Sequence, residues 1–279
     1  MNEGNKRAEK NQRKNIRTQQ SKLLTIISCH DKSDIFDKTI YRIMILTPFL
    51  YGIEETIGVH IILSNIFWWA SLLLVITAYR NRNLWHVGDT PWTFLFLTFL
   101  FFGIRELGHL SSSPLIASVR YVFGIWSAIF MTSLFIYLYV LIYMRKTIPK
   151  IATYLPFVLA LVFPLFILFL FFAGIKPDDL KNIMFSIENL VWIAGSSITI
   201  LTTFLLGTRA AGGFVRVFML FQIAAILALL WKFLGLIASM GCTIPYSIRE
   251  TLETLFGVFA IISVYVLTKM LKSLARTIR

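Results

Sequence analysis

The sequence predicts an all-α, polytopic integral membrane helix bundle, and three observations lead to this prediction. Hydrophobic residues make up 57% of the 279-residue chain, which contains 25 Phe, and the mean hydropathy is +0.74. Successive apolar runs approach the length of about 20 helical residues that crosses a bilayer core roughly 30 Å thick. Lys and Arg gather in the short segments between these runs, as the positive-inside rule describes. Such a composition is typical of a membrane protein.

The first 38 residues are expected to form a basic cytoplasmic tail. They contain Lys6, Arg7, Lys10, Arg13, Lys14, Arg17 and Lys22 against Glu3 and Glu9. The only apolar cluster, residues 23–27, is too short for the core of a signal peptide, so we expect the segment to be retained. It is interpreted either as a disordered tail that fixes orientation or as a patch that binds anionic lipid. Nucleic acid is not expected as a partner, because the basic residues behind the net charge of +13 lie in tails and loops.

Eight membrane spans are predicted within a transmembrane domain covering residues 39–272, followed by a short basic cytoplasmic tail, 273–279. The spans lie near residues 39–55, 58–79, 92–111, 121–144, 151–174, 185–206, 214–239 and 254–272. The first is short, contains Pro48 and ends in Glu54 and Glu55, so an interfacial or re-entrant helix is the alternative for that segment. Seven spans would place one basic terminus outside, so six spans plus an interfacial N-terminal helix is the second arrangement.

Alternation of the basic linkers predicts that both termini are cytoplasmic. Basic residues follow span two (Arg80, Arg82) and span four (Arg145, Lys146, Lys150), flank the turn after span six (Arg209, Arg216) and close the chain (Lys269, Lys272, Arg276, Arg279). The intervening linkers, 111–119, 176–182 and 240–253, are neutral or mixed. An even number of spans follows. Cys29 and Cys242 are then expected on opposite sides of the membrane, so no intramolecular disulfide is predicted.

A short pattern recurs at the predicted outer tips of the helical hairpins. An aromatic residue, Gly or Ser, Ile, then Glu or Arg, then Glu or Asn occurs at 51–55, 102–106, 185–189 and 246–250. This placement favours four repeated helical hairpins related by an axis along the membrane normal. The alternative is that aromatic, Ser and Glu residues simply favour the membrane interface.

The candidate functional residues gather in one polar layer in the outer third of the membrane. Arg105, Glu106 and His109 share one surface of span three, because side chains three and four residues apart are neighbours on a helix. Helical rise places Glu106 about 21 Å from Trp92, and Lys232 of span seven reaches a similar depth. The other members are Glu54, Glu55, His60, Glu188 and Glu250, with Asn189, Arg249 and Glu253 beside them.

Three interpretations of this layer are open. Glu106 and His109 have the Glu-x-x-His spacing of carboxylate and imidazole metal ligands, although the motif occurs once, and His60 with His109 could ligate a haem. The second interpretation is a set of structural ion pairs, with Glu106 paired to Lys232 or to a neighbouring arginine. The third is a relay or binding site for a proton, a cation or an anionic solute.

The sequence favours a small transporter over an enzyme. It contains no His-Glu-x-x-His, no Gly-x-Ser-Gly pairing and no Asp-x-x-x-Asp pair, so no catalytic motif is assigned. The predicted function is transport by an outward-facing polar layer of acidic and histidine side chains that binds a cation, a proton or an anionic solute. The alternatives are a membrane sensor or assembly factor, and a metal- or haem-dependent integral enzyme. The sequence specifies no cofactor and no oligomeric state, and the bilayer is the one partner it clearly predicts.

Overall fold

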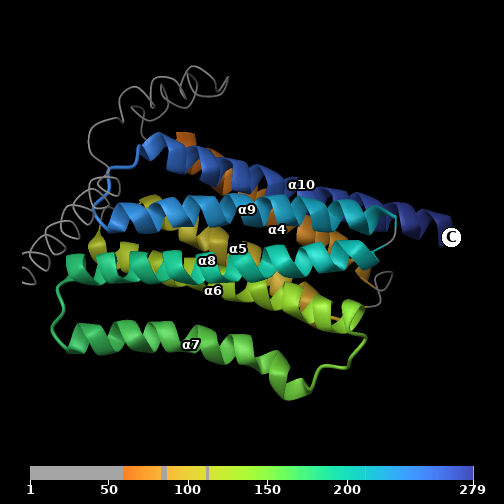
Figure 1. Cartoon of the computed structure of the whole chain (residues 1–279), viewed down its shortest axis with the longest axis horizontal. Helices are drawn as coiled ribbons and strands as arrows, with labels where there is room; N and C mark the ends of the chain where they lie inside the picture. Colours follow the sequence, from red (N-terminus) through yellow and green to blue (C-terminus); the bar gives the residue numbers. More distant parts are fainter. Residues whose placement is uncertain (1–58, 83–86, 111–112, 211, 279) are drawn as a thin grey trace, which may run out of the picture.

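The computed structural model describes residues 59–82, 87–110, 113–210 and 212–278, and this part of the chain is helical without a β-strand (Figure 1). The helices are α4 (Val59–Tyr79), α5 (Thr90–Leu107), α6 (Pro114–Leu138), α7 (Lys150–Phe172), α8 (Pro177–Arg209), α9 (Gly213–Ser239) and α10 (Tyr246–Ile278). A 3₁₀ turn, η2 (Gly108–Leu110), follows α5, and a π-helical turn, η3 (Tyr139–Tyr143), extends α6.

The chain is an integral membrane protein with at least five helices long and apolar enough to cross a bilayer. These segments are Pro114–Tyr143, Lys150–Phe172, Pro177–Arg209, Gly213–Ser239 and Ile248–Ala275. The predicted all-helical membrane class is therefore confirmed, whereas eight spans stay a prediction. The predicted first span, 39–55, and the tail 1–38 lie outside the described residues.

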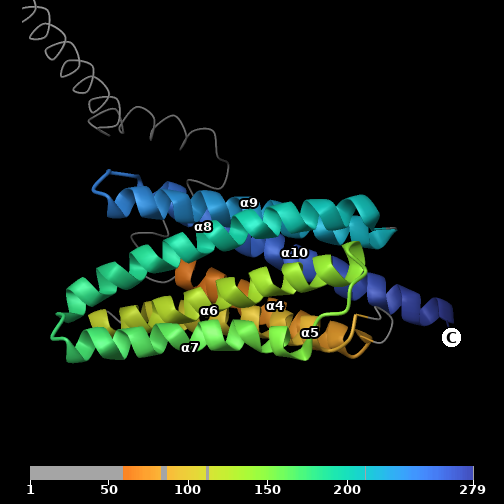
Figure 2. The same ribbon diagram turned by 60° about the horizontal axis from the view of Figure 1, so that its bottom comes forward.

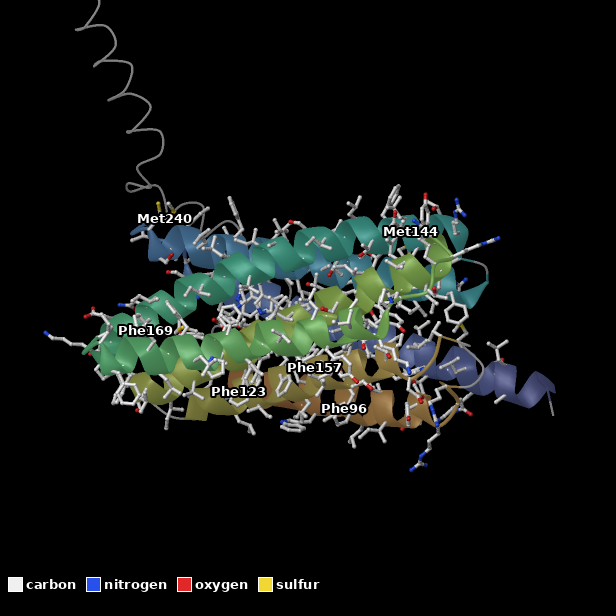
Figure 3. The ribbon with its side chains drawn as sticks, turned by 90° about the horizontal axis from the view of Figure 1, so that it is seen from below. Phe96, Phe123, Met144, Phe157, Phe169 and Met240 are labelled. Carbon is white, nitrogen blue, oxygen red and sulfur yellow. The ribbon has the colours of Figure 1, made fainter. Side chains whose placement is uncertain are left out.

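Large apolar side chains cover the outside of the bundle (Figure 3). Two thirds of Phe169 and more than three quarters of Met240 are exposed. Within the hydrophobic span of α7 only 17% of the residues are buried inside the protein, although this helix has the highest mean hydropathy of the five. Such a surface is suited to hydrocarbon and not to water.

Six of the described helices form a closed ring, and α7 lies outside it. Contacts run from α4 to α5, α6, α8, α9, α10 and back to α4. The exception is α7, which packs on the outside of the ring against α6, and both ribbon views show it there (Figures 1 and 2). Neighbouring helices along the chain run in opposite directions. One end of the bundle therefore carries His109 and the α7–α8 turn, and the other carries Lys146 and the α8–α9 turn; we call them the His109 end and the Lys146 end.

A proline in α7 supports its attachment to the ring. Pro164 has no N–H, so the carbonyl of Ala160, four residues earlier, has no partner in the helix ladder. The Trp126 indole of α6 donates a hydrogen bond to that carbonyl at 2.7 Å. Toward the His109 end, Ile167 of α7 belongs to a small apolar core with Tyr121 of α6. The second half of α7 is thus held against the bundle.

Several helices begin earlier than the lengths of the apolar runs predict. The predicted linker 176–182 is mostly helical, because α8 starts at Pro177, and α6 starts at Pro114 inside the predicted linker 111–119. Proline is favoured in the first helical turn, where its missing N–H would have no partner. At the other end of the chain, α10 continues to Ile278, through most of the predicted tail. Apolar length therefore missed the polar helical turns that extend beyond the predicted spans.

The predicted hairpin repeat is not confirmed. The pattern at 102–106 lies near the carboxyl end of α5, whereas those at 185–189 and 246–250 lie in the amino-terminal halves of α8 and α10. The three copies occupy the same end of the bundle but not equivalent positions in it. The fourth copy, 51–55, is outside the described residues.

Candidate functional site

A cluster of five charged side chains is buried between four helices near the His109 end. Its members are Arg105 and Glu106 of α5, Glu188 of α8, Lys232 of α9 and Glu253 of α10, and each is at most 3% exposed. Arg105 joins three of the helices: its Nε donates to Glu188 Oε1 at 2.7 Å, its Nη1 to Glu253 Oε1 at 2.9 Å, and the same nitrogen contacts Glu106. We call these five residues the charge cluster.

Glu188 is the central carboxylate of the charge cluster. While one of its oxygens accepts from Arg105, the other lies 2.8 Å from the Lys232 ammonium. Two buried cations therefore share one carboxylate. Charges in hydrocarbon are tolerated when they are paired in this way, because the pairing offsets part of the cost of removing them from water.

A group of buried aromatic rings lies directly beneath the charge cluster and fills the centre of the ring of helices. This aromatic cluster consists of Trp68, Phe102, Trp192, Trp231 and Phe256. Phe102 is its hub, with ring centroids 3.9 Å from Trp68 and 5.6 Å from both Trp192 and Phe256. The Arg105 guanidinium lies 5.0 Å from the rings of Phe102 and Trp231, so the rings' negative faces add to its stabilisation.

On the other side of the charge cluster, toward the His109 end, lies a polar cavity of about 410 Å³. Basic and acidic side chains line it, together with Tyr121, Phe185 and Trp231. Its charged lining residues are Arg105, Arg120, Lys181, Lys232, Arg249, Glu250 and Glu253. Glu106 and Glu188 pair directly with this lining, so among the described residues five basic side chains lie at the site with four carboxylates. Its volume is within the roughly 300–1,000 Å³ usual for small-molecule sites.

Asn189 is a buried amide that lines this cavity. Its side chain is 1% exposed, and within the described part of the chain neither its oxygen nor its nitrogen has a hydrogen-bond partner. An amide in that situation costs about 1–3 kcal/mol relative to a paired one. It lies against Gly235 of α9, where an added Cβ would be 3.0 Å from the amide oxygen. A polar ligand in the cavity would supply the missing partner.

Gly124 of α6 makes room for the charge cluster, and its substitution gives a direct test of that packing. A Cβ at this position would lie 2.0 Å from Glu188 Oε1 and 3.1 Å from Arg105 Cδ. We expect Gly124→Ala to lower the free energy of unfolding by about 1–3 kcal/mol, the usual cost of overpacking. Gly207→Ala is the matched control, because a Cβ there meets nothing within 4 Å. Thermal unfolding of the detergent-solubilised variants measures both; equal stability of the two would show that Glu188 is not confined by α6.

The structure brings together most of the predicted polar layer. Glu106, Arg105, Glu188 and Lys232 belong to the charge cluster, Glu250 lines the cavity, and His109 lies 3.8 Å from Glu106 Oε2. Lys232 pairs with Glu188, while Glu106 pairs with Arg105, its neighbour in sequence. Of the remaining predicted residues, Glu54 and Glu55 lie outside the described residues, as does the side chain of His60.

Arg120 and Lys181 were not among the predicted site residues, whereas Asn189 was placed beside the polar layer. Arg120 precedes the predicted fourth span by one residue, and Lys181 falls in a predicted linker. Their common signal is that each lies within about two helical turns of the start of a helix at the His109 end. Placing the starts of α6 and α8 at Pro114 and Pro177 would have put Arg120 and Lys181 on the cavity wall.

The predicted metal ligands lie side by side, but no third ligand joins them in the described part of the chain. Within that part, no group of three or more His, Cys, Asp and Glu side chains is arranged to hold a metal ion. Of the ligand pair, Glu106 contacts the Arg105 guanidinium, a group that competes with a cation for the same oxygen.

In comparisons with protein-family models, curated proteins and solved structures, none matches this chain.

Proposed function

We propose that the protein is a small membrane transporter that binds an anionic solute in the cavity at the His109 end. The observation that carries this proposal is the cationic lining of a cavity set into an apolar helix bundle, above a buried cluster of paired charges. Polar and charged groups at such depth are costly, and they commonly mark the path of a solute or an ion. The excess of basic side chains favours an anion over a cation or a metal.

Each part of the site has a distinct role in this proposal. Arg120, Lys181 and Arg249 provide donors for a carboxylate or phosphate group, and the Asn189 amide provides a neutral donor and acceptor deeper in the cavity. The charge cluster forms the floor and holds α5, α8, α9 and α10 at a fixed spacing. Beneath it the aromatic cluster closes the centre of the ring. With the orientation expected from the basic linkers, the cavity opens outward.

Asn189→Leu is the substitution that tests binding most selectively. If the amide serves a ligand, the ligand-free variant should unfold at the same temperature as the wild type or a higher one, because an unpaired buried amide is replaced by an apolar group of similar size. Succinate, citrate or inorganic phosphate at constant ionic strength should raise the unfolding temperature of the wild type, since a ligand that binds only the folded state stabilises it. The variant should lose that response.

Two controls complete this experiment. Ser197→Leu changes an exposed residue of the same helix and should keep the wild-type response to anions. Succinamide, the neutral analogue of succinate, should stabilise neither protein. Equal stabilisation by succinamide and succinate, or a full anion response in Asn189→Leu, would contradict anion binding at this site.

A further inference from the structure

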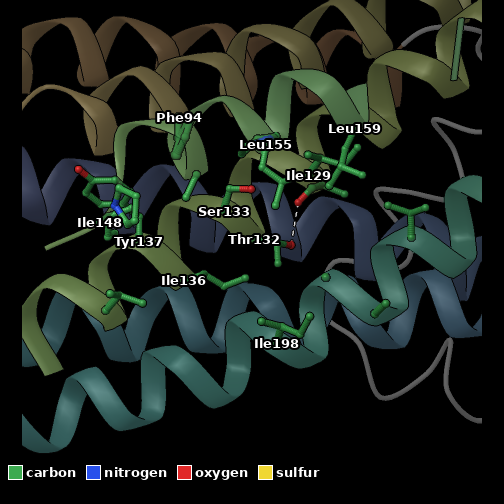
Figure 4. A pocket seen from close by; sticks show the side chains of 18 of the residues that line it. Phe94, Ile129, Thr132, Ser133, Ile136, Tyr137, Ile148, Leu155, Leu159 and Ile198 are labelled. Carbon is green, nitrogen blue, oxygen red and sulfur yellow. Dashed lines mark hydrogen bonds between the residues drawn. The ribbon is translucent and has the colours of Figure 1, made fainter. Parts of the chain in front are cut away.

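A second cavity is apolar and lies nearer the Lys146 end, where Lys146 itself lines it. Its volume is about 650 Å³, and α6, α7 and α8 form its walls together with the linker 146–149. Ile129 and Ile136 of α6, Leu155 and Leu159 of α7 and Ile198 of α8 line it (Figure 4). It shares no lining residue with the polar cavity.

The way α7 is attached explains why this cavity exists. The second half of α7 is held to α6 through Trp126 and the small apolar core that contains Ile167. The first half, from Lys150 to Leu159, follows a linker that leaves the end of α6, and it stands away from α8. On the α8 side the wall consists of Val191, Ala194, Gly195 and Ile198. A slot remains between α6, α7 and α8, beside a helix, α7, whose hydrophobic span is only 17% buried inside the protein.

Basic residues lie near the part of the slot at the Lys146 end, which we call its mouth. Lys146 lines it, and Arg145 and Lys150 flank Lys146 in the sequence. A fourth cation, Arg209 of α8, lies 4.4 Å from the ring of Tyr143, which belongs to the turn before the linker. The sequence has no acidic residue between Glu106 and Asp178 to balance these charges on α6, α7 or their linker. The slot thus combines an apolar interior with a cationic mouth.

We propose that this slot holds an acyl chain of an anionic phospholipid, with the phosphate group beside Lys146. An apolar cavity of this kind excludes water and takes an apolar occupant. Lipid chains are the apolar molecules that surround α7. Basic side chains at the membrane surface select lipids with a net negative charge. The bound chain fills the gap between α7 and α8 and ties the first half of α7 to the ring.

Native mass spectrometry of the full-length protein tests this proposal. Delipidated protein in detergent is mixed with equal amounts of phosphatidylglycerol and phosphatidylcholine of the same chain length. One phosphatidylglycerol should remain bound to each monomer, with a preference over phosphatidylcholine of about fivefold for each basic side chain that reaches the phosphate. Equal retention of the two lipids, or a dimer whose interface excludes lipid, would overturn the proposal.

Two pairs of variants locate the lipid. Ala152→Phe fills the slot from α7 and should reduce the retained phosphatidylglycerol to background, whereas Val158→Phe, on the exposed face of the same helix, should not. Lys146→Gln should reduce the preference for phosphatidylglycerol about fivefold, while Lys176→Gln, in the loop at the opposite end, should leave it unchanged. Unchanged binding in both Ala152→Phe and Lys146→Gln would show that the lipid lies elsewhere. The surface substitution Lys146→Gln keeps the test decisive if Ala152→Phe does not fold.

Discussion

Glu188→Gln is expected to cause a large loss of folded protein. The substitution keeps the size of the side chain but removes the negative charge that lies between Arg105 and Lys232, at 2.7 and 2.8 Å. The buried cations Arg105 and Lys232 are then left with the carboxylates of Glu106 and Glu253 alone in the charge cluster. Breaking a buried ion pair typically costs about 3–5 kcal/mol, because the remaining charge stays desolvated. The unfolding temperature and the folded yield from size-exclusion chromatography in detergent both report the effect.

A second substitution separates pairing from other effects at position 188. Lys232→Met removes the ammonium that Glu188 neutralises, so Glu188→Gln combined with Lys232→Met should recover part of the lost stability. Asp179→Asn neutralises an exposed acid on the same helix and should have little effect. A Glu188→Gln protein as stable as the wild type would show that the charge cluster contributes little to holding the four helices together.

The sequence predicted which residues belong to the charge cluster better than it predicted which carboxylate pairs with which cation. Arg105, Glu106 and Lys232 are recognisable because charged residues interrupt apolar runs. Lys232 nevertheless pairs with Glu188 and not with Glu106. The choice between these partners depends on which helices are neighbours in the ring and on their relative axial positions, and neither is encoded in the spacing of residues along one helix. Gly124 shows the same limit, since its role depends on Glu188 reaching across from another helix.

The wall of the polar cavity could also be predicted only in part, but for a different reason. Hydropathy locates the stretch of chain inside hydrocarbon, but a helix can begin one or two turns earlier, in polar sequence. Lys181 was assigned to a linker, whereas α8 starts at Pro177 and carries it on a helical turn. The apolar cavity beside α7 left no signal, because its walls are mostly apolar residues of the kind found throughout membrane helices. Pro164 leaves the carbonyl of Ala160 without a partner in the helix ladder, and the structure shows that this carbonyl accepts from Trp126 of α6, which hydropathy does not predict.

Lys181→Gln is expected to weaken anion binding strongly while leaving the fold intact. Lys181 lines the polar cavity but does not belong to the charge cluster. A hydrogen bond to a charged group contributes about 1.5–3 kcal/mol, so its loss should raise the dissociation constant roughly tenfold or more. Lys176→Gln makes the same change five residues earlier, at an exposed position outside the cavity, and should bind anions as the wild type does. Unfolding temperatures without ligand should be similar for both variants.

Charge movement across a membrane tests the transport proposal most directly. Proteoliposomes adsorbed on a solid-supported membrane are exposed to a step of succinate, citrate or inorganic phosphate, and the resulting current is recorded. The proposal predicts a current in the wild type for at least one of these anions, a similar current in Lys176→Gln, a shift to roughly tenfold higher concentration in Lys181→Gln, and none with succinamide. The absence of a current for every anion, or the same concentration dependence in Lys181→Gln and the wild type, would contradict it.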